Sequence, residues 1–192
     1  MRTRIITLLV ALLFGSIISF AQSEHLKFKG VPMDGTLENF MLQMEKKGLV
    51  TDVVIGNSAI MKGEFAGYDN CDIYIYSANN SVYMINAIIH MTSNWSVLES
   101  CYYNLKEMLT TKYGYPHMCT EEFKHQYSER SDMSKVNALL MDECTFSTVY
   151  KPDNGFINLR MGQTNNYKCH ICIAYVDDKN DKKKQESVYD DL

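Results

Sequence analysis

Residues 95–116 have the sequence WSVLESCYYNLKEMLTTKYGYP, which is the clearest helix pattern in the chain. Ser96 followed by Glu99 predicts a capping box at the start of this helix. Gly114 and Pro116 predict its end, because glycine adopts the left-handed conformation easily and proline prevents the helix from resuming. The apolar side chains recur at three- and four-residue spacings, which places them on one side of the helix: Leu98, Cys101, Tyr102, Leu105, Met108 and Leu109. So wide an apolar stripe must be covered, and the strand-like segments on both sides of it are the candidates.

The first 21 residues have the composition of a signal peptide. Arg2 and Arg4 precede a long apolar run, and Ser19 and Ala21 are small residues at the positions that a signal peptidase recognises. A membrane anchor is the alternative, but the run is short for a span of roughly 20 residues. We therefore expect cleavage before Gln22, export to the periplasm or the extracellular space, and no membrane insertion of the mature protein.

Length and charge limit the class of protein further. The chain has 192 residues with a net charge of −4, and removal of the signal peptide would take away two arginines and leave a more acidic chain. A mildly acidic surface does not favour binding to nucleic acid or to anionic membranes. The remaining length suits one domain with an ordinary hydrophobic core.

The cysteine content leaves two alternatives open. An even number of cysteines in an exported chain predicts disulfide bonds, whereas free cysteine is also among the most buried residue types. We expect a mixture, with one bridge among the six residues Cys71, Cys101, Cys119, Cys144, Cys169 and Cys172.

The rest of the chain is predicted to alternate between helices and runs of antiparallel strands. A lead-in strand over residues 24–33 precedes helices over 37–48, 95–113 and 133–141, and strands over 53–57, 59–65, 71–77, 82–91, 117–124, 144–151, 156–161 and 168–176. This pattern predicts an α+β fold, with helices packed on an antiparallel meandering sheet in one domain, residues 22–176. Residues 177–192 are highly charged, and we expect them to be a mobile C-terminal tail or a loosely docked end.

The two halves of the domain have a similar order of elements. Each half opens with a helix that ends at a glycine, Gly48 or Gly114, and continues with strands. The similarity predicts either two pseudo-repeated helix-plus-sheet halves or a chance likeness between two meanders.

Motifs that would indicate catalysis or metal binding are weak. The Cys169-His170-Ile171-Cys172 segment has the spacing of a redox or zinc motif, but it lies in a predicted strand, where residues three apart point to opposite faces. The five histidines form no recognisable ligand pattern, and neither a nucleophile elbow nor a glycine-rich phosphate loop is present. We therefore predict no catalytic residues, no metal site and no cofactor.

The most suggestive pattern is the alternation over residues 71–77. Ile73 and Ile75 share one face of the predicted strand, and Asp72, Tyr74 and Tyr76 share the other. If this second face is open to solvent, its rings form an amphipathic platform that suits a protein or carbohydrate ligand. If helices or a second sheet cover it, the tyrosines belong to the core.

Three segments of the chain resemble landmarks of known proteins. Residues 28–40, 95–116 and 173–180 resemble segments of small exported proteins of gut-dwelling Gram-negative bacteria that have no assigned activity. The resemblance implies an exported bacterial protein and no particular chemistry. The order of elements is also similar to the tandem repeats of β-lactamase-inhibitor proteins, although no motif is shared and function does not follow from a fold.

Together these observations predict a non-catalytic, exported binding module with Asp72, Tyr74 and Tyr76 as its binding residues. The alternative is a hydrolase that acts on glycan or peptide through carboxylates or a histidine assembled by the fold. A structural envelope component, which would form a stable homo-oligomer, is a third possibility, and the sequence leaves the oligomeric state open.

Overall fold

The computed structural model describes residues 25–91, 93–124, 131–164 and 168–189. The signal peptide predicted over residues 1–21 lies outside the described residues, as does most of the loop predicted over residues 127–131. None of the helices in the described part of the chain combines the length and the apolar character that a membrane span requires.

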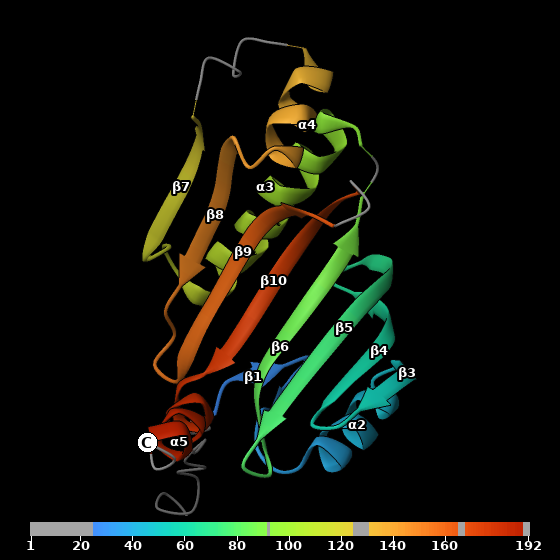
Figure 1. Cartoon of the computed structure of the whole chain (residues 1–192), viewed down its shortest axis with the longest axis vertical. Helices are drawn as coiled ribbons and strands as arrows, with labels where there is room; N and C mark the ends of the chain where they lie inside the picture. The colour runs from blue at the N-terminus through green and yellow to red at the C-terminus, as the bar shows by residue number, and fades with distance from the viewer. Residues whose placement is uncertain (1–24, 92, 125–130, 165–167, 190–192) are drawn as a thin grey trace, which may run out of the picture.

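An eight-stranded antiparallel sheet dominates the structure, in the order β3-β4-β5-β6-β10-β9-β8-β7 (Figure 1). Its strands are β3 (Val50–Ile55), β4 (Ser58–Phe65), β5 (Tyr68–Ala78), β6 (Ser81–His90), β7 (Met118–Phe123), β8 (Cys144–Tyr150), β9 (Gly155–Gln163) and β10 (Cys169–Asp177). The lead-in segment forms two short paired strands, β1 (Lys27–Phe28) and β2 (Val31–Pro32). The structure confirms the predicted α+β class and the antiparallel meander.

The strand order divides the sheet into two similar halves. Helix α2 (Leu37–Lys46) precedes β3 to β6, and helix α3 (Trp95–Tyr113) precedes β7 to β10, with helix α4 (Asp132–Leu140) inserted after β7. The last strands of the two halves, β6 and β10, pair with each other from His170↔His90 to Val176↔Met84. Each half is therefore a helix followed by a four-stranded meander, and the two meanders meet at the middle of the sheet.

Helices α2, α3 and α4 lie on one side of the sheet, and α5 (Asp178–Tyr189) lies at one end of it (Figure 1). The apolar face of the sheet packs under these helices, because residues two apart on a strand share a face. The largest fully buried side chains include Trp95, Tyr102, Tyr150, Phe28, Phe40, Ile73, Ile75, Ile85 and Ile89. This face also contains Ile157, Leu159 and Met161 of β9 and Ile171, Ile173 and Tyr175 of β10.

The ends of the helices agree with the sequence in part. Gly114 ends α3 with a φ of 83°, as predicted, and Thr36 caps α2 by accepting from the Asn39 amide. The predicted capping box of Ser96 and Glu99 is wrong. Asn94, two residues earlier, is the N-cap and accepts from the Val97 amide at 3.1 Å, while the Ser96 hydroxyl donates to Asp132 of α4. An asparagine oxygen caps as well as serine does, and it starts the helix one residue before Ser96.

The C-terminal segment differs from the expected mobile tail or loosely docked end. Residues 178–189 form α5, which is fixed by the buried residue Asn180. Its side-chain amide donates to the Met33 carbonyl at 2.7 Å and to the Val82 carbonyl at 2.9 Å. The preceding Asp177 is fully buried and accepts from the Leu26 amide at 2.7 Å and the Asn180 amide at 3.0 Å. Two polar residues thus anchor a segment whose composition is that of a solvated tail.

All six cysteines are free thiols in the structure, so the expected disulfide bond is not formed. Five are buried, and Cys119 is exposed. Cys169 and Cys172 lie on β10 at positions that face opposite sides of the sheet, as their spacing predicted. The buried cysteines therefore act as small apolar side chains.

We predict that Asn180→Ala lowers the free energy of unfolding by roughly 2 kcal/mol or more, because two buried carbonyls lose their donor and each such loss costs about 1–3 kcal/mol. Urea denaturation followed by circular dichroism would measure the change. Gln185→Ala, on the exposed side of the same helix, is the matched control and should change the stability by less than about 0.5 kcal/mol. Equal stability of the two variants would show that Asn180 does not anchor α5.

Candidate functional site

The sheet face opposite α2, α3 and α4 has no helix across it in the described ranges (Figure 1). Residues that are paired across adjacent strands form three rows of side chains on this face. The first row contains Lys62, Asp72, Ile88, Cys172, Arg160 and Ser147, the second contains Ile60, Tyr74, Asn86, Ala174, Asn158 and Val149, and the third contains Ser58, Tyr76, Met84, Val176 and Phe156. The face therefore mixes aromatic, apolar and charged groups, with apolar groups in every row.

The structure places Asp72, Tyr74 and Tyr76 together on this face, and all three are half-buried. Tyr74 lies between Ile60 of β4 and Asn86 of β6, and Tyr76 lies between Ser58 and Met84 on the same two strands. Burial raises the pKa of the Tyr76 phenol, and the neighbouring Tyr74 and Tyr83 raise it further. The rings thus rest partly on their neighbours and present their remaining surface to solvent.

Asp72 is already engaged within the face. Its carboxylate lies 2.8 Å from His90 Nε2, on the adjacent strand β6. Lys62, its neighbour on β4, pairs instead with Asp52 at 2.9 Å. The role of Asp72 is therefore to hold His90 on the face, in addition to the predicted contact with a ligand.

The middle of the face contains polar groups that the sequence analysis did not single out. His170 lies directly opposite His90 across the β6–β10 junction and packs over Gly162, where a Cβ would come within 2.8 Å of His170 Nε2. His170 Nδ1 is buried and has no hydrogen-bond partner, and the same is true of the Asn86 side-chain oxygen. Burial lowers the pKa of His170, and Arg160 and His90 lower it further. The centre of the face thus has unsatisfied polar atoms beside an exposed arginine.

One signal in the sequence could have identified Arg160. Along residues 156–161 the apolar residues Ile157, Leu159 and Met161 alternate with Phe156, Asn158 and Arg160, so the two sets lie on opposite faces of the strand. The alternation predicts which face of the strand Arg160 lies on, but it does not predict which residues of the adjacent strands lie beside it. Only the strand order brings Arg160 next to Cys172 and places His170 opposite His90.

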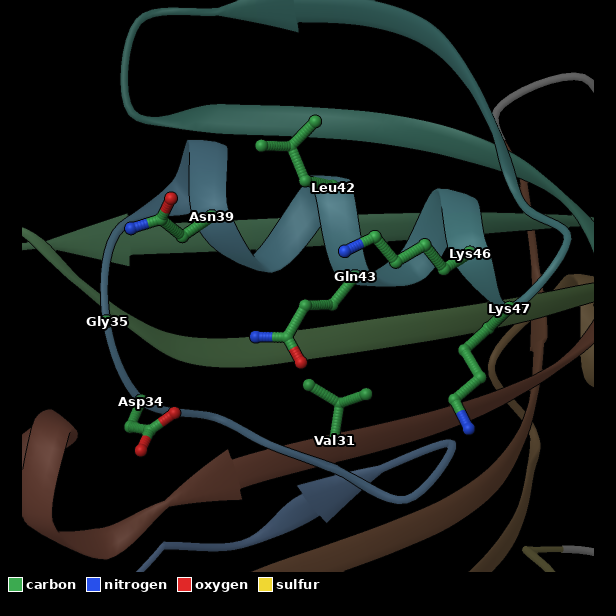
Figure 2. A pocket seen from close by; sticks show the side chains of 8 residues that line it. All are labelled: Val31, Asp34, Gly35, Asn39, Leu42, Gln43, Lys46 and Lys47. Atoms are coloured by element: carbon green, nitrogen blue, oxygen red, sulfur yellow. The ribbon is translucent and has the colours of Figure 1, made fainter.

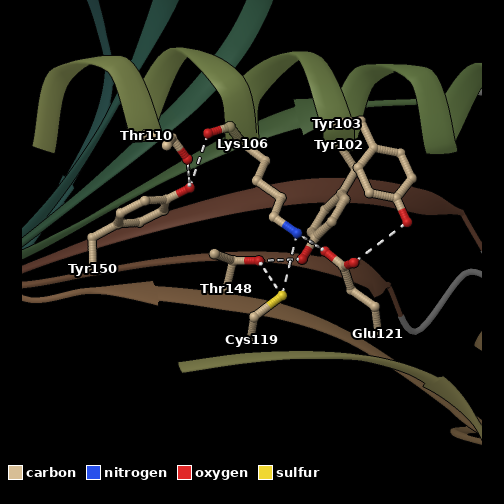
Figure 3. Close-up of polar contacts among 8 residues, drawn as sticks. All are labelled: Tyr102, Tyr103, Lys106, Thr110, Cys119, Glu121, Thr148 and Tyr150. Carbon is tan, nitrogen blue, oxygen red and sulfur yellow. Dashed lines mark hydrogen bonds and ion pairs between the residues drawn. The ribbon is translucent and has the colours of Figure 1, made fainter. Parts of the chain in front are cut away.

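A second group of polar side chains joins α3 to β7 and β8, on the helix-covered side of the sheet. Figure 3 shows Lys106 of α3 extending toward Glu121 and Cys119 of β7. The Lys106 ammonium pairs with the Glu121 carboxylate and donates to the Cys119 sulfur at 3.3 Å. Deeper in the layer, Tyr102 and Thr148 share a hydrogen bond of 2.6 Å.

This group is a connection between layers, since its members bind one another. Burial alone would lower the pKa of Lys106 and raise the pKa of Glu121. The hydrogen bond between the two side chains and their contact with Cys119 outweigh burial. The pKa of Lys106 is therefore raised, and the pKa of Glu121 is lowered. Both side chains are therefore charged near neutral pH. No set of three or more His, Cys, Asp or Glu side chains in the described ranges is placed to hold a metal ion.

A pocket of about 590 Å³ lies beside α2 (Figure 2). Polar side chains border much of it, and none of the eight lining residues is aromatic: Val31, Asp34, Gly35, Asn39, Leu42, Gln43, Lys46 and Lys47. Amide, carboxylate and ammonium groups suit hydrogen bonding to a hydroxylated ligand, but the pocket lacks a ring on which a sugar would stack. It is therefore a weaker candidate than the sheet face.

No protein-family model, curated protein or solved structure matches the chain.

We predict that Tyr102→Phe destabilises the fold by about 1–2 kcal/mol, because the fully buried Thr148 hydroxyl loses its hydrogen bond to Tyr102 and keeps only the weaker contact with Cys119 Sγ at 3.5 Å. Tyr103→Phe is the matched control, because the Tyr103 hydroxyl lies at the exposed rim, 3.5 Å from Glu121. This control should change the free energy of unfolding by less than about 0.5 kcal/mol. Urea midpoints would compare the two variants, and a larger effect of Tyr103→Phe would contradict the assignment.

The Lys106–Glu121 pair predicts a defined dependence of stability on pH. Because the pKa of Glu121 is lowered in the folded state, its contribution is complete above the ordinary value of 4.5 and is lost as the pH falls through the lower, folded value. Glu121→Gln should therefore reduce the loss of stability between about pH 7 and about pH 3. Lys106→Met should reduce the pH-dependent loss of stability by the same amount. Urea midpoints of the two variants that change with pH as those of the wild type do would contradict the prediction.

Proposed function

We propose that the protein is a non-catalytic binding module whose helix-free sheet face binds a partner protein through Tyr74 and Tyr76. The observation that carries the proposal is the position of these two half-buried rings on a face that no described helix covers. Export of the chain, predicted from residues 1–21, would bring this face into contact with envelope or extracellular proteins.

The composition of the face supports a protein partner. Tyrosine and arginine are the side chains that most often dominate binding energy at protein interfaces, together with tryptophan. Here the tyrosines lie on β5 and the exposed Arg160 lies on β9, on the other side of the β6–β10 junction. Met84, Ile88 and other apolar side chains fill the space between them, as in the core of an interface. A partner that covers both ends would span the middle of the sheet.

The unsatisfied atoms at the centre support the same proposal. A buried polar atom without a hydrogen-bond partner costs roughly 1–3 kcal/mol. His170 Nδ1 and Asn86 Oδ1 are such atoms in the chain alone. Since neither atom is accessible to solvent, a partner would recover part of this cost where its binding displaces the side chains that cover them.

The hydrolase alternative stays a prediction of the sequence. It requires at least two titratable groups that converge on a cleft, and loss of activity without loss of stability when one of them is removed. Assays with glycan and peptide substrates would test it directly.

We predict that Tyr74→Ala together with Tyr76→Ala weakens partner binding by about tenfold or more while the protein stays folded, because such rings are typical anchors of an interface. Biotinylated residues 22–192 would be incubated with exported proteins of the source cells, and captured proteins would be quantified by mass spectrometry. Tyr115→Ala is the matched control, because Tyr115 is 94% exposed and lies outside the face.

The expected result is a partner that the wild type and the Tyr115→Ala control capture and that the double variant loses. Circular dichroism and thermal denaturation would report the fold of each variant. Retention of the partner by the double variant would refute the role of the two rings, and unfolding of the double variant would show that they belong to the core.

A further inference from the structure

The sheet has two terminal strands, β3 and β7, and each pairs with a single neighbour in the sheet. A terminal strand directs alternate backbone N–H and C=O groups away from the sheet, where another strand can pair with them. Charged side chains and covering elements normally block such pairing. The two edges of this sheet differ in both respects.

The β7 edge is protected. Its sequence is MCTEEF, with two adjacent glutamates, and Lys124 follows directly. On the helix-covered side, the space between α3 and β7 is occupied by the Lys106–Glu121 pair and by Cys119 (Figure 3). An added strand would have to desolvate or displace these charges.

The β3 edge is apolar and exposed. Its sequence is VTDVVI, and the exposed fractions of Val50, Val54 and Ile55 are 68%, 52% and 71%. The one charged residue, Asp52, lies at a β-bulge and is paired with Lys62 at 2.9 Å. Branched apolar side chains are those that favour strand pairing, so this edge is suited to accept a further strand.

A groove runs between this edge and α2. It has a volume of about 300 Å³ and is lined by Leu37, Glu38, Met41, Leu42, Glu45 and Val54. Val54 pairs with the buried Ala59, so its side chain lies on the helix-covered side of the sheet. Alternate side chains of a strand added beside β3 would point toward the same side and enter the apolar groove.

The charges of the groove favour a basic occupant. Glu38 and Glu45 are its two charged lining residues, and Thr51 of β3 donates to Glu45 Oε1 at 3.0 Å, which holds that carboxylate beside the edge. A second copy of the chain, paired through β3, would bring the same glutamates near one another. A strand with lysine or arginine would instead meet opposite charge.

We propose that β3 and the groove beside α2 form a strand-addition site for an extended peptide segment of a partner protein, in which the residues that face the groove are in part apolar and in part lysine or arginine. Backbone hydrogen bonds to β3 supply the pairing, and the groove selects the side chains, as in other β-augmentation complexes. This site is separate from the proposed tyrosine face, because the groove lies on the helix-covered side of the sheet.

The experiment uses an array of ten-residue peptides in which every second residue, on one face of the strand, is in turn valine or isoleucine and then lysine, arginine, glutamate or serine, while the residues of the other face are threonine. Binding to the mature chain is measured by fluorescence anisotropy with labelled peptides. We expect the lysine and arginine series to bind with Kd values below about 1 mM, and the glutamate series to bind at least tenfold more weakly.

Three controls test the geometry. The backbone amides of the best peptide are methylated in two alternating sets, the odd-numbered or the even-numbered residues. Only one set can face β3. Methylation of that set should weaken binding at least tenfold, because the peptide strand loses its hydrogen-bond donors to β3. Glu38→Lys with Glu45→Lys should reverse the preference toward the glutamate series. Tyr74→Ala with Tyr76→Ala should leave peptide binding unchanged, which separates this site from the proposed function.

Several outcomes would overturn the proposal. They are the absence of binding by any series, binding that is insensitive to methylation of either set of amides, and binding that depends on Tyr74 and Tyr76. Light scattering provides a further one: a dimer of the mature chain that Val54→Arg dissociates would identify a second copy as the occupant. Circular dichroism of every variant confirms that a loss of binding is not a loss of fold.

Discussion

The pairing of β6 with β10 is the interaction on which the rest of the structure depends. These are the last strands of two separate meanders, and their backbone hydrogen bonds join the meanders into one sheet. Ile85 and Ile89 on β6, with Ile171 and Ile173 on β10, are buried at this junction under the helices. Neither half could bury these residues alone, so the two halves stabilise each other across the junction.

The same junction creates the candidate binding face. Helices α2 and α3 both pack on one side of the sheet, so the opposite side remains for the residues that alternate with the core residues. Tyr74 and Tyr76 come from the first half and Arg160 from the second, and His90 and His170 meet between them. Asp177 at the end of β10 and Asn180 of α5 then join the start of the described chain and β6 to this half, because they bind Leu26, Met33 and Val82.

Local patterns predicted the parts of this structure that local physics decides. The glycine that ends the helix over residues 95–113 and the alternation around Ile73 and Ile75 are confirmed. The apolar stripe of that helix is confirmed except at Met108, which is 51% exposed. Strand order and register could not be predicted, since they depend on contacts between residues far apart in the sequence. The pairing of Asp72 with His90 depends on the same kind of contact. The composition of residues 178–189 predicts a tail, whereas α5 is held in place by two buried hydrogen-bonding residues, Asp177 and Asn180.

The difference between the two edges of the sheet has a consequence for assembly. A sheet that accepts strands at both edges can grow without limit, which is the geometry of a fibre. Here the charges of β7 close one edge, while β3 leaves the other open. A strand added at β3, as proposed above, would therefore extend the sheet at one edge only, and repeated pairing of β3 of one copy with β7 of the next, which a fibre requires, would be blocked.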